Sequence, residues 1–421
     1  MLMRYSTLCV PIGLCVLWRA LAISCQAQPR DSTESEPPQV RFREFAPGIA
    51  HTNYRLAEVP WSVQVVSVDR GDPSLEVLSV HARGGVGRVS TLTEQLRALK
   101  PDLGEPLAAV NGDFYARDRS AYAGDPRGLQ IVDGDLISAP VGGAAFWIDP
   151  RGGLHTTNVV SQFKVTWPDG SSMPFGLNQA RRSGAVLYTP SMGASTFTRT
   201  GTELVLEHGG EGPWLPLRVG EAFTARVREV RETGSSPLAR DALVLSLDPG
   251  ATRFAARLEP GAVLRFSTAT LPDLRGVKTA ISGGPVLVNN GRLQSVRLNR
   301  LADSMSYEFR SMSERHPRSA LGWNASQFFL IQVDGRQAGL SVGMTLDEVG
   351  LFALKRLGCT YAMNLDGGVS STLWANGRVR NSPCAGGERD LANGLVVVRK
   401  SGAVKDPSRS GSLRPASPSG E

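Results

Sequence analysis

The chain has 421 residues, of which 41% are hydrophobic and 20% are charged, and it contains 46 glycines and 27 prolines. This composition suits a globular protein of one large or two smaller domains, and it argues against a helical bundle. The net charge is +7, but the basic residues are scattered and form no run interleaved with aromatic side chains. This pattern argues against nucleic-acid binding.

The first 27 residues have the pattern of an export signal. Arg4 precedes an apolar run over residues 5–18, and small residues follow up to Ala27. The run is shorter than the roughly 20 apolar residues that a membrane-spanning helix needs. We therefore expect a signal peptide over residues 1–27, export to the periplasm or the medium, and no transmembrane segment in the mature protein. A lipoprotein acylated at Cys25 is the alternative.

Composition also marks the segments that flank the folded part. Residues 28–40 are polar and rich in proline, which predicts a linker, and residues 399–421 consist largely of Ser, Pro, Gly and Arg, which predicts a disordered tail. Between them, alternating β-branched residues at 61–68 and 74–80 predict strands in an N-terminal segment over residues 41–104.

Local signals predict one short helix and two hairpins in the middle of the chain. Residues 90–99 have a capping residue at the start and Pro101 beyond the end, which is typical of a short amphipathic helix. The pairs Asp133-Gly134 and Asn290-Gly291 lie between strand-like runs and predict tight hairpin turns. Residues 155–270 are mostly strand-like.

The C-terminal third predicts a strand, a helix and a second strand. Residues 327–333 and 361–365 are apolar runs, and between them Thr345 and Glu348 form a capping box before a helix over residues 346–357. This order predicts two parallel strands joined by a right-handed crossover. The expected fold class is therefore α+β, with a β-rich mixed sheet and a C-terminal βαβ unit.

This topology also predicts where polar side chains meet. Parallel strands end at one edge of a sheet, and ligands bind outside those ends. Asp334 and Arg336 follow the first strand, and Asp366 follows the second. We expect these three side chains to lie close together.

Two cysteines, Cys359 and Cys384, remain beyond the signal region. In an oxidising compartment such a pair can form a disulfide, but two unrelated buried thiols fit the sequence equally well, because bridging depends on geometry. Two cysteines without a histidine cluster also argue against a zinc site.

Polar clusters that contain glycine interrupt the apolar strands at residues 111–115, 281–285, 315–320 and 364–371, and Glu388-Arg389 follows. One such cluster alone is usually a turn. Together they indicate a polar pocket assembled from strand ends.

The order of these motifs resembles the phosphodiester glycosidase family, and the resemblance covers residues 105–398. Ser282 and Val369 stand where the family more often has glycine, and neither difference changes a charge. The motifs are Asn-Gly-Asp-Phe-Tyr at 111–115, Ser-Gly-Gly-Pro at 282–285, Arg-His-Pro-Arg at 315–318, Asp-Gly-Arg at 334–336, and Asn-Leu-Asp-Gly-Gly-Val-Ser-Ser at 364–371.

The resemblance implies a hydrolase that cleaves the bond between the anomeric carbon of a sugar and a phosphodiester. The substrate would be a sugar phosphodiester or a glycan, and no cofactor would be required. Because the sugar carbon becomes oxocarbenium-like, a carboxylate is needed beside it. Asp366 is the first candidate, since it follows a strand and precedes two glycines. The other candidate catalytic residues are Asp113, Asp334, Glu388 and His316.

Arginine can bind a phosphate through two parallel hydrogen bonds, which lysine does less well. The metal-binding residues are unknown, but Ca²⁺ or another divalent cation held by Asp113, Asp334 and Asp366 is an alternative. The candidate substrate-binding residues are Asn111, Gly283, Gly284, Arg315, Arg318, Arg336, Asn364, Gly367, Gly368, Ser370, Ser371 and Arg389.

Two other functions remain open. The chain could be a non-catalytic glycan-binding accessory protein of exopolysaccharide metabolism, or a phosphodiesterase that cuts the P–O bond. The products formed from a sugar phosphodiester distinguish the three: free sugar, no product, or sugar 1-phosphate. The sequence leaves the sugar, its acceptor, the stereochemical course and the oligomeric state open.

Overall fold

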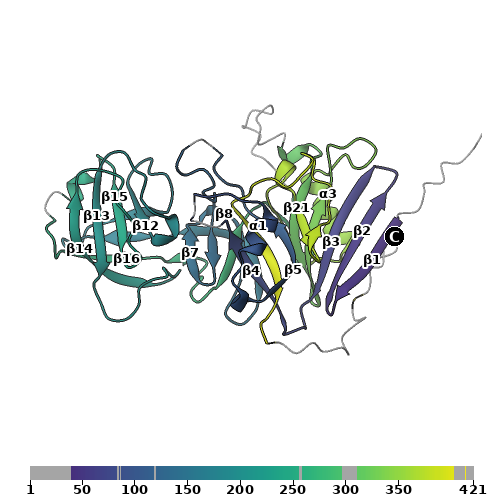
Figure 1. Cartoon of the computed structure of the whole chain (residues 1–421), viewed down its shortest axis with the longest axis horizontal. Coiled ribbons are helices and arrows are strands. Elements are labelled where there is room, and N and C mark those ends of the chain that lie inside the picture. The colour runs from purple at the N-terminus through teal and green to yellow at the C-terminus, as the bar shows by residue number, and fades with distance from the viewer. Residues whose placement is uncertain are drawn as a thin grey trace, which may run out of the picture. The chain divides into compact units, whose positions relative to one another are not determined.

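The computed structural model describes residues 39–82, 85, 87–117, 120–255, 258–295, 311–402 and 413 (Figure 1). The predicted signal peptide, most of the linker, Cys25 and nearly all of the predicted tail lie outside these residues. The first strand begins at Gln39, inside the predicted linker, and the last strand ends at Arg399, the first residue of the predicted tail. Among the described residues, no helix is long and apolar enough to cross a membrane.

An eight-stranded sheet carries the edge at which the predicted site residues lie (Figure 1). Each strand pairs antiparallel with its neighbours. Its strands, in spatial order, are β1 (Gln39–Ala46), β2 (Ile49–Leu56), β3 (Trp61–Asp69), β22 (Gln327–Val333), β21 (Arg318–Trp323), β23 (Tyr361–Asn364), β19 (Val286–Asn289) and β20 (Arg292–Leu293).

Both faces of this sheet are covered, so its central strands are apolar on both sides. Alternate residues of a strand point to opposite faces. Phe329 and Ile331 of β22 therefore pack with Val349 and Phe352 of helix α3 (Leu346–Arg356), which covers one face. Phe328 and Leu330 point to the other face and pack against the five-stranded sheet.

The five-stranded sheet consists of β25 (Arg378–Val379), β24 (Leu373–Ala375), β5 (Glu105–Asn111), β26 (Asn393–Arg399) and β4 (Leu75–His81). Helix α1 (Leu92–Arg97) packs on it through Leu92 and Leu96, and Thr91 and Glu94 form its capping box. The sequence predicted this helix over residues 90–99, so its position is confirmed to within the fraying expected at helix ends.

Two further layers come from the middle of the chain. A six-stranded sheet contains β17 (Thr270–Leu271), β9 (Leu154–Ser161), β8 (Val141–Ile148), β18 (Thr279–Ser282), β6 (Gln130–Val132) and β7 (Asp135–Ser138). A closed barrel contains β10 (Lys164–Thr166), β11 (Ser172–Leu177), β12 (Ala185–Tyr188), β15 (Leu243–Leu247), β13 (Thr202–His208), β14 (Ala222–Arg231) and β16 (Val263–Ser267). Short 3₁₀ turns lie at Pro101–Leu103, Pro190–Met192, Thr252–Phe254 and Gly368–Ser370.

The predicted local elements are confirmed where their signals were strongest. Helix α3 begins after Thr345, whose hydroxyl accepts the Glu348 N–H in the predicted capping box. Asp133 and Gly134 have positive φ angles of 47° and 79° between β6 and β7. Asn290 and its following glycine form the same kind of turn between β19 and β20, with Asn290 at φ 49°.

The predicted pair of adjacent parallel strands is not formed. β22 and β23 run in the same direction, but β21 lies between them and pairs antiparallel with both. The described residues are mostly strand, in several sheets and a barrel, so neither the α+β class nor a simple βαβ unit is confirmed. β22 and β23 nevertheless end at the same edge of the sheet, since each is antiparallel to β21.

The two cysteines are free in the structure. Cys359 is buried beside Gly322, where a Cβ would come within 2.8 Å of its sulfur, and burial raises the pKa of its thiol. Cys384 is half-buried in the loop before Glu388. The disulfide that the sequence left open is therefore not formed.

Candidate functional site

A cavity of about 710 Å³ opens at the edge where β22 and β23 end and where β19 and β21 begin. Most of its lining residues come from the predicted motifs, although those motifs are far apart in the chain. The lining residues are Phe114, Tyr115, Arg117, Arg127, Gly284, Pro285, Ser311, Met312, Glu314, His316, Arg318, Arg336, Leu346, Asn364, Asp366, Gly367 and Gly368.

Asp366, the first catalytic candidate, lines this cavity directly after β23. Its backbone N–H donates to the Gly112 carbonyl at 2.9 Å, and its own carbonyl accepts from Asn111 Nδ2 at 2.7 Å. Its Oδ1 accepts the Gly367 N–H at 2.8 Å. Burial raises the pKa of Asp366, and the Ser370 hydroxyl and the Gly367 amide oppose that rise. The carboxyl is thus held by backbone and hydroxyl groups and faces the cavity.

Asp113 lies beside Asp366 but is not among the cavity-lining side chains. It is 5% exposed; its Oδ1 accepts the Phe114 N–H and its Oδ2 accepts the Gly128 N–H, both at 2.8 Å. Burial raises the pKa of Asp113 to about 7, and the nearby charge of Asp366 also raises it. Below about pH 7, the site therefore holds a proton on Asp113 next to Asp366.

Two of the four predicted arginines line the cavity. Arg336 has a φ of +58° and donates to His316 Nδ1 at 3.2 Å. His316 Nε2 lies 3.5 Å from a Glu314 carboxylate oxygen, so the ring proton belongs on Nε2. The Arg318 guanidinium is buried and donates to the backbone carbonyls of Met344, Ser311 and Glu314 at 2.6–2.8 Å. Arg318 therefore supports the wall of the cavity.

The other two predicted arginines lie outside the lining. Arg315 pairs with Glu348 at 2.6 Å, and its guanidinium lies 5.7 Å from the centre of the Trp61 ring. Arg389 is half-buried, and its charge opposes the burial-driven rise in the pKa of Asp366. Only Arg389 of these two acts electrostatically on the cavity.

Two of the predicted acidic residues, Asp334 and Glu388, accept hydrogen bonds from other segments of the chain outside the cavity. Asp334 is 1% exposed and accepts from the Ser62 hydroxyl and the Ser382 N–H, each at 2.8 Å. Glu388 accepts the Thr93 N–H at 3.1 Å, in the first turn of α1. Neither lines the cavity, so the predicted carboxylates do not all converge.

The same separation bears on the metal hypothesis. Within the residues that the structure describes, no group of three or more His, Cys, Asp or Glu side chains is arranged to hold a metal ion. Asp113, Asp334 and Asp366 therefore do not form the cation site that the sequence suggested as an alternative.

Asn364 lines the cavity. Its Nδ2 donates to the Gly284 carbonyl at 2.9 Å, and among the described residues its buried Oδ1 has no hydrogen-bond partner. Gly284 and Gly367 also line the cavity, while Gly283 packs behind it, where a Cβ would come within 2.6 Å of the Asn364 carbonyl. Gly368 has a φ of +65°, so a larger residue would be strained there.

The remaining predicted binding residues form the support beneath the cavity. Asn111 is fully buried, and its Oδ1 accepts from the Ser319 hydroxyl at 2.6 Å and the Thr372 N–H at 3.0 Å. Ser370 hydrogen-bonds Asp366, and Ser371 is buried next to it.

Sequence reasoning missed Arg117 and Arg127, which line the cavity from the loop after the 111–115 motif. Both are exposed, and in the described part of the chain neither forms an ion pair. Arg117 acts electrostatically on Asp366 and Arg127 on Asp113. The sequence feature that could have identified them is the group of arginines at residues 117–127, directly after a predicted site motif.

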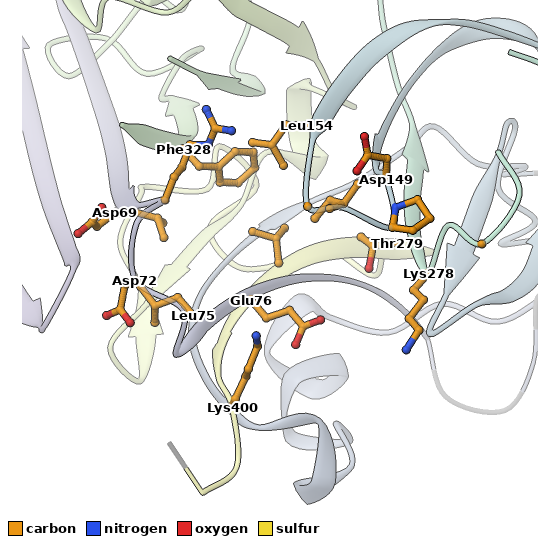
Figure 2. Close-up of a pocket in the computed structure, with 17 residues that line it drawn as sticks. Asp69, Asp72, Leu75, Glu76, Asp149, Leu154, Lys278, Thr279, Phe328 and Lys400 are labelled. Carbon is orange, nitrogen blue, oxygen red and sulfur yellow. The ribbon is translucent and has the colours of Figure 1, made fainter. Parts of the chain in front are cut away.

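A separate cavity of about 510 Å³ contains none of the predicted site residues (Figure 2). It is lined by apolar residues such as Leu75 and Phe328, by the acidic residues Asp69, Asp72, Glu76 and Asp149, and by the basic residues Arg70, Lys278 and Lys400. Because acidic and basic groups nearly balance there, this cavity lacks the excess of arginine that marks the first one.

The phosphodiester glycosidase family model matches residues 220–398. No curated protein sequence matches the chain significantly. A hypothetical protein from Synechocystis has the same fold, with a TM-score of 0.68 and 19% identity, over 86% of this chain and 64% of that one. A candidate exported protein from Burkholderia pseudomallei K96243 also shares the fold, with a TM-score of 0.62 and 22% identity, over 83% of this chain and 77% of that one.

The comparisons also include the zebrafish N-acetylglucosamine-1-phosphodiester alpha-N-acetylglucosaminidase catalytic domain, auto-inhibited by its pro-peptide. It matches with a TM-score of 0.38 and 17% identity, over 86% of this chain and 82% of that one. The family-model match alone confirms the predicted resemblance to the phosphodiester glycosidase family, over residues 220–398 of this chain.

Proposed function

We propose that the chain is an exported hydrolase that cleaves the bond between a sugar's anomeric carbon and a phosphodiester in a glycan or cell-envelope substrate. One observation carries the proposal: the Asp366 carboxylate shares a cavity with the guanidinium groups of Arg117, Arg127 and Arg336. Its family resemblance supports glycosidase chemistry. The signal-like N-terminus, and a fold shared with a candidate exported protein, support export.

The charges of the cavity suit the leaving group. Among the described residues, four arginines line it against two acidic residues, Asp366 and Glu314. Arg318 is held by backbone carbonyls, whereas Arg117 and Arg127 are exposed and form no ion pair in the described part of the chain. These two guanidiniums can bind a phosphate oxygen pair and stabilise the phosphate monoester as it leaves.

The carboxyl groups suit the sugar side of the reaction. When the C1–O bond breaks, its electron pair leaves with the phosphate, and positive charge develops at the anomeric carbon. An ionised Asp366 can stabilise that charge, attack the carbon or activate the water that adds to it. Burial raises the pKa of Asp113 to about 7, so below that pH its carboxyl is neutral and adds no second negative charge beside Asp366.

Product analysis tests the proposal. The purified protein is incubated with UDP-N-acetylglucosamine and with other sugar 1-phosphodiesters, and products are identified by NMR. Free sugar is expected; sugar 1-phosphate would indicate a phosphodiesterase, and no product from the panel would favour a glycan-binding protein.

A matched pair of variants tests the role of Asp366. Asp366→Asn should lower kcat by about 10²- to 10⁴-fold, the usual contribution of a positioned acid or base, with an unchanged circular dichroism spectrum. Asp102→Asn, at an exposed turn outside the cavity, is the control and should keep full activity. Equal activity of the two variants would show that Asp366 is not catalytic.

A further inference from the structure

Another cavity, of about 550 Å³, adjoins the candidate active site and is called the second cavity below. Arg117 and Arg127 line both cavities, so the two cavities adjoin at these residues. The second cavity is lined by Ala116, Arg117, Tyr122, Asp125, Pro126, Arg127, Gln179, Ala180, Arg182 and Ser183.

Its chemistry fits an anion. Among the described lining residues, three arginines (Arg117, Arg127 and Arg182) stand against one acidic residue, Asp125. All three arginines are exposed, and in the part of the chain that the structure describes none forms an ion pair. Neighbouring like charges repel one another, and a bound phosphate would relieve that repulsion and accept their hydrogen bonds. Gln179 and Ser183 add further polar groups to the wall.

Backbone hydrogen bonds hold Arg117 and Arg127 together. The Ala116 N–H donates to the Asp125 carbonyl at 2.9 Å, and the Gly124 N–H donates to the Ala116 carbonyl at 2.8 Å. The Arg127 N–H donates to the Phe114 carbonyl at 2.9 Å. The two ends of this loop are therefore fixed side by side at the entrance to the active site.

Another part of the lining, residues 179–183, comes from the segment between strands β11 and β12 of the barrel. Tyr122 lies 3.1 Å from Tyr188, oxygen to oxygen, and Tyr122 also donates to the Thr196 carbonyl. Tyr188, in β12, donates to the Gln179 carbonyl at 2.8 Å. These bonds connect the loop that carries Arg117 and Arg127 to the segment that carries Arg182. The second cavity is thus built by two connected segments.

We propose that the second cavity binds a second phosphate group of the substrate. The substrate class is then a glycan with successive phosphodiesters, of which one is cleaved beside Asp366 while the next is held by Arg182. Arg117 and Arg127 lie between the two positions and can contact both phosphates. This inference rests on the proposed function, which supplies the reaction. It adds that the substrate carries more than one phosphate.

Two matched substrates separate the two phosphate positions. One is a sugar 1-phosphate methyl diester, with a single phosphate. The other is the same sugar 1-phosphate esterified to a sugar that carries a second phosphate. Arg182→Glu should raise KM for the second substrate by about 10-fold, the lower end for hydrogen bonds to charged groups. For the first substrate, KM should stay within about twofold of the wild type.

Arg151→Glu supplies the control, because Arg151 is an exposed arginine outside both cavities. It makes the same charge change and should affect neither substrate. An equal change in KM for both substrates in Arg182→Glu, or no change in either, would overturn the proposed second site.

Binding measurements keep this result independent of turnover. Calorimetry with the Asp366→Asn protein, with and without Arg182→Glu, measures the affinity for the two-phosphate compound. A loss of affinity of about 10-fold that depends on Arg182 supports the second site even if neither compound is hydrolysed, in which case the proposed reaction alone fails. Equal affinities of the two proteins, or binding by neither, overturn the second site.

Discussion

The buried carboxyl of Asp113 should make the stability of the protein depend on pH in a defined way. Its pKa is about 7 in the folded protein, against 3.8 for an ordinary aspartate. Below about pH 4 the carboxyl is protonated in both the folded and unfolded states. Between about pH 4 and 7 the unfolded chain releases this proton while the folded protein keeps it, so the free energy of unfolding falls as pH rises.

The magnitude follows from the two pKa values. The interval from 3.8 to about 7 corresponds to about 4 kcal/mol, at about 1.4 kcal/mol for each pH unit. Asp113→Asn removes this titration. It also replaces one acceptor oxygen with an NH₂ group, which would face the N–H donor of either Phe114 or Gly128 and should cost about 1–3 kcal/mol at every pH. The variant should therefore be less stable than the wild type at pH 4.5, and the deficit should shrink or reverse by pH 8.

Urea denaturation followed by tryptophan fluorescence, at four pH values from 4.5 to 8, measures this difference. Titrating groups that do not interact with Asp113, including Asp334 and Asp135, cancel when the variant is subtracted from the wild type. We expect the difference in the free energy of unfolding to change by at least about 2 kcal/mol over this range. Parallel pH profiles for the two proteins would refute the claim that Asp113 holds its proton to neutral pH.

Two further substitutions test the site and the fold. Arg127→Ala should raise KM for a sugar phosphodiester by about 10- to 100-fold, the range for losing hydrogen bonds to a charged group. Arg315→Ala should leave KM unchanged, because Arg315 pairs with Glu348 outside the cavity. Equal effects of the two substitutions in steady-state kinetics would contradict this assignment. Thr345→Ala should lower the free energy of unfolding by about 1 kcal/mol, through loss of the cap on α3, and a urea midpoint that does not move would contradict it.

The sequence predicted the elements whose causes are local. A capping box needs only Thr345 and Glu348 three residues apart, and a tight hairpin needs only residues such as Asp133 and Gly134 that accept positive φ. Both features were found where they were expected. Asp366 likewise follows β23 and lines the cavity, and the glycine pair directly after an apolar strand is the local pattern that indicated this position.

Strand pairing has no comparable local signal. β21 precedes β22 in the chain, yet it lies between β22 and β23 in the sheet. Its position depends on contacts between distant segments, such as the close approach of Gly322 to Cys359. The sequence order of strand, helix and strand was therefore compatible with two alternative strand orders in the sheet. In one, β22 and β23 are adjacent; in the other, which the structure shows, β21 lies between them.

The insertion of β21 explains which predicted side chains reach the cavity. Strands lie about 4.8 Å apart, so the ends of β22 and β23 are separated by about 10 Å. The short Asp334 side chain, at the end of β22, turns toward β3 and bonds Ser62. Arg336 follows two residues later at a positive φ, and its long side chain extends into the cavity and donates to His316. At this distance the length of a side chain decides whether it lines the cavity. The long Arg336 side chain from the end of β22 reaches the cavity that Asp366 lines, whereas the short Asp334 side chain from the same end does not.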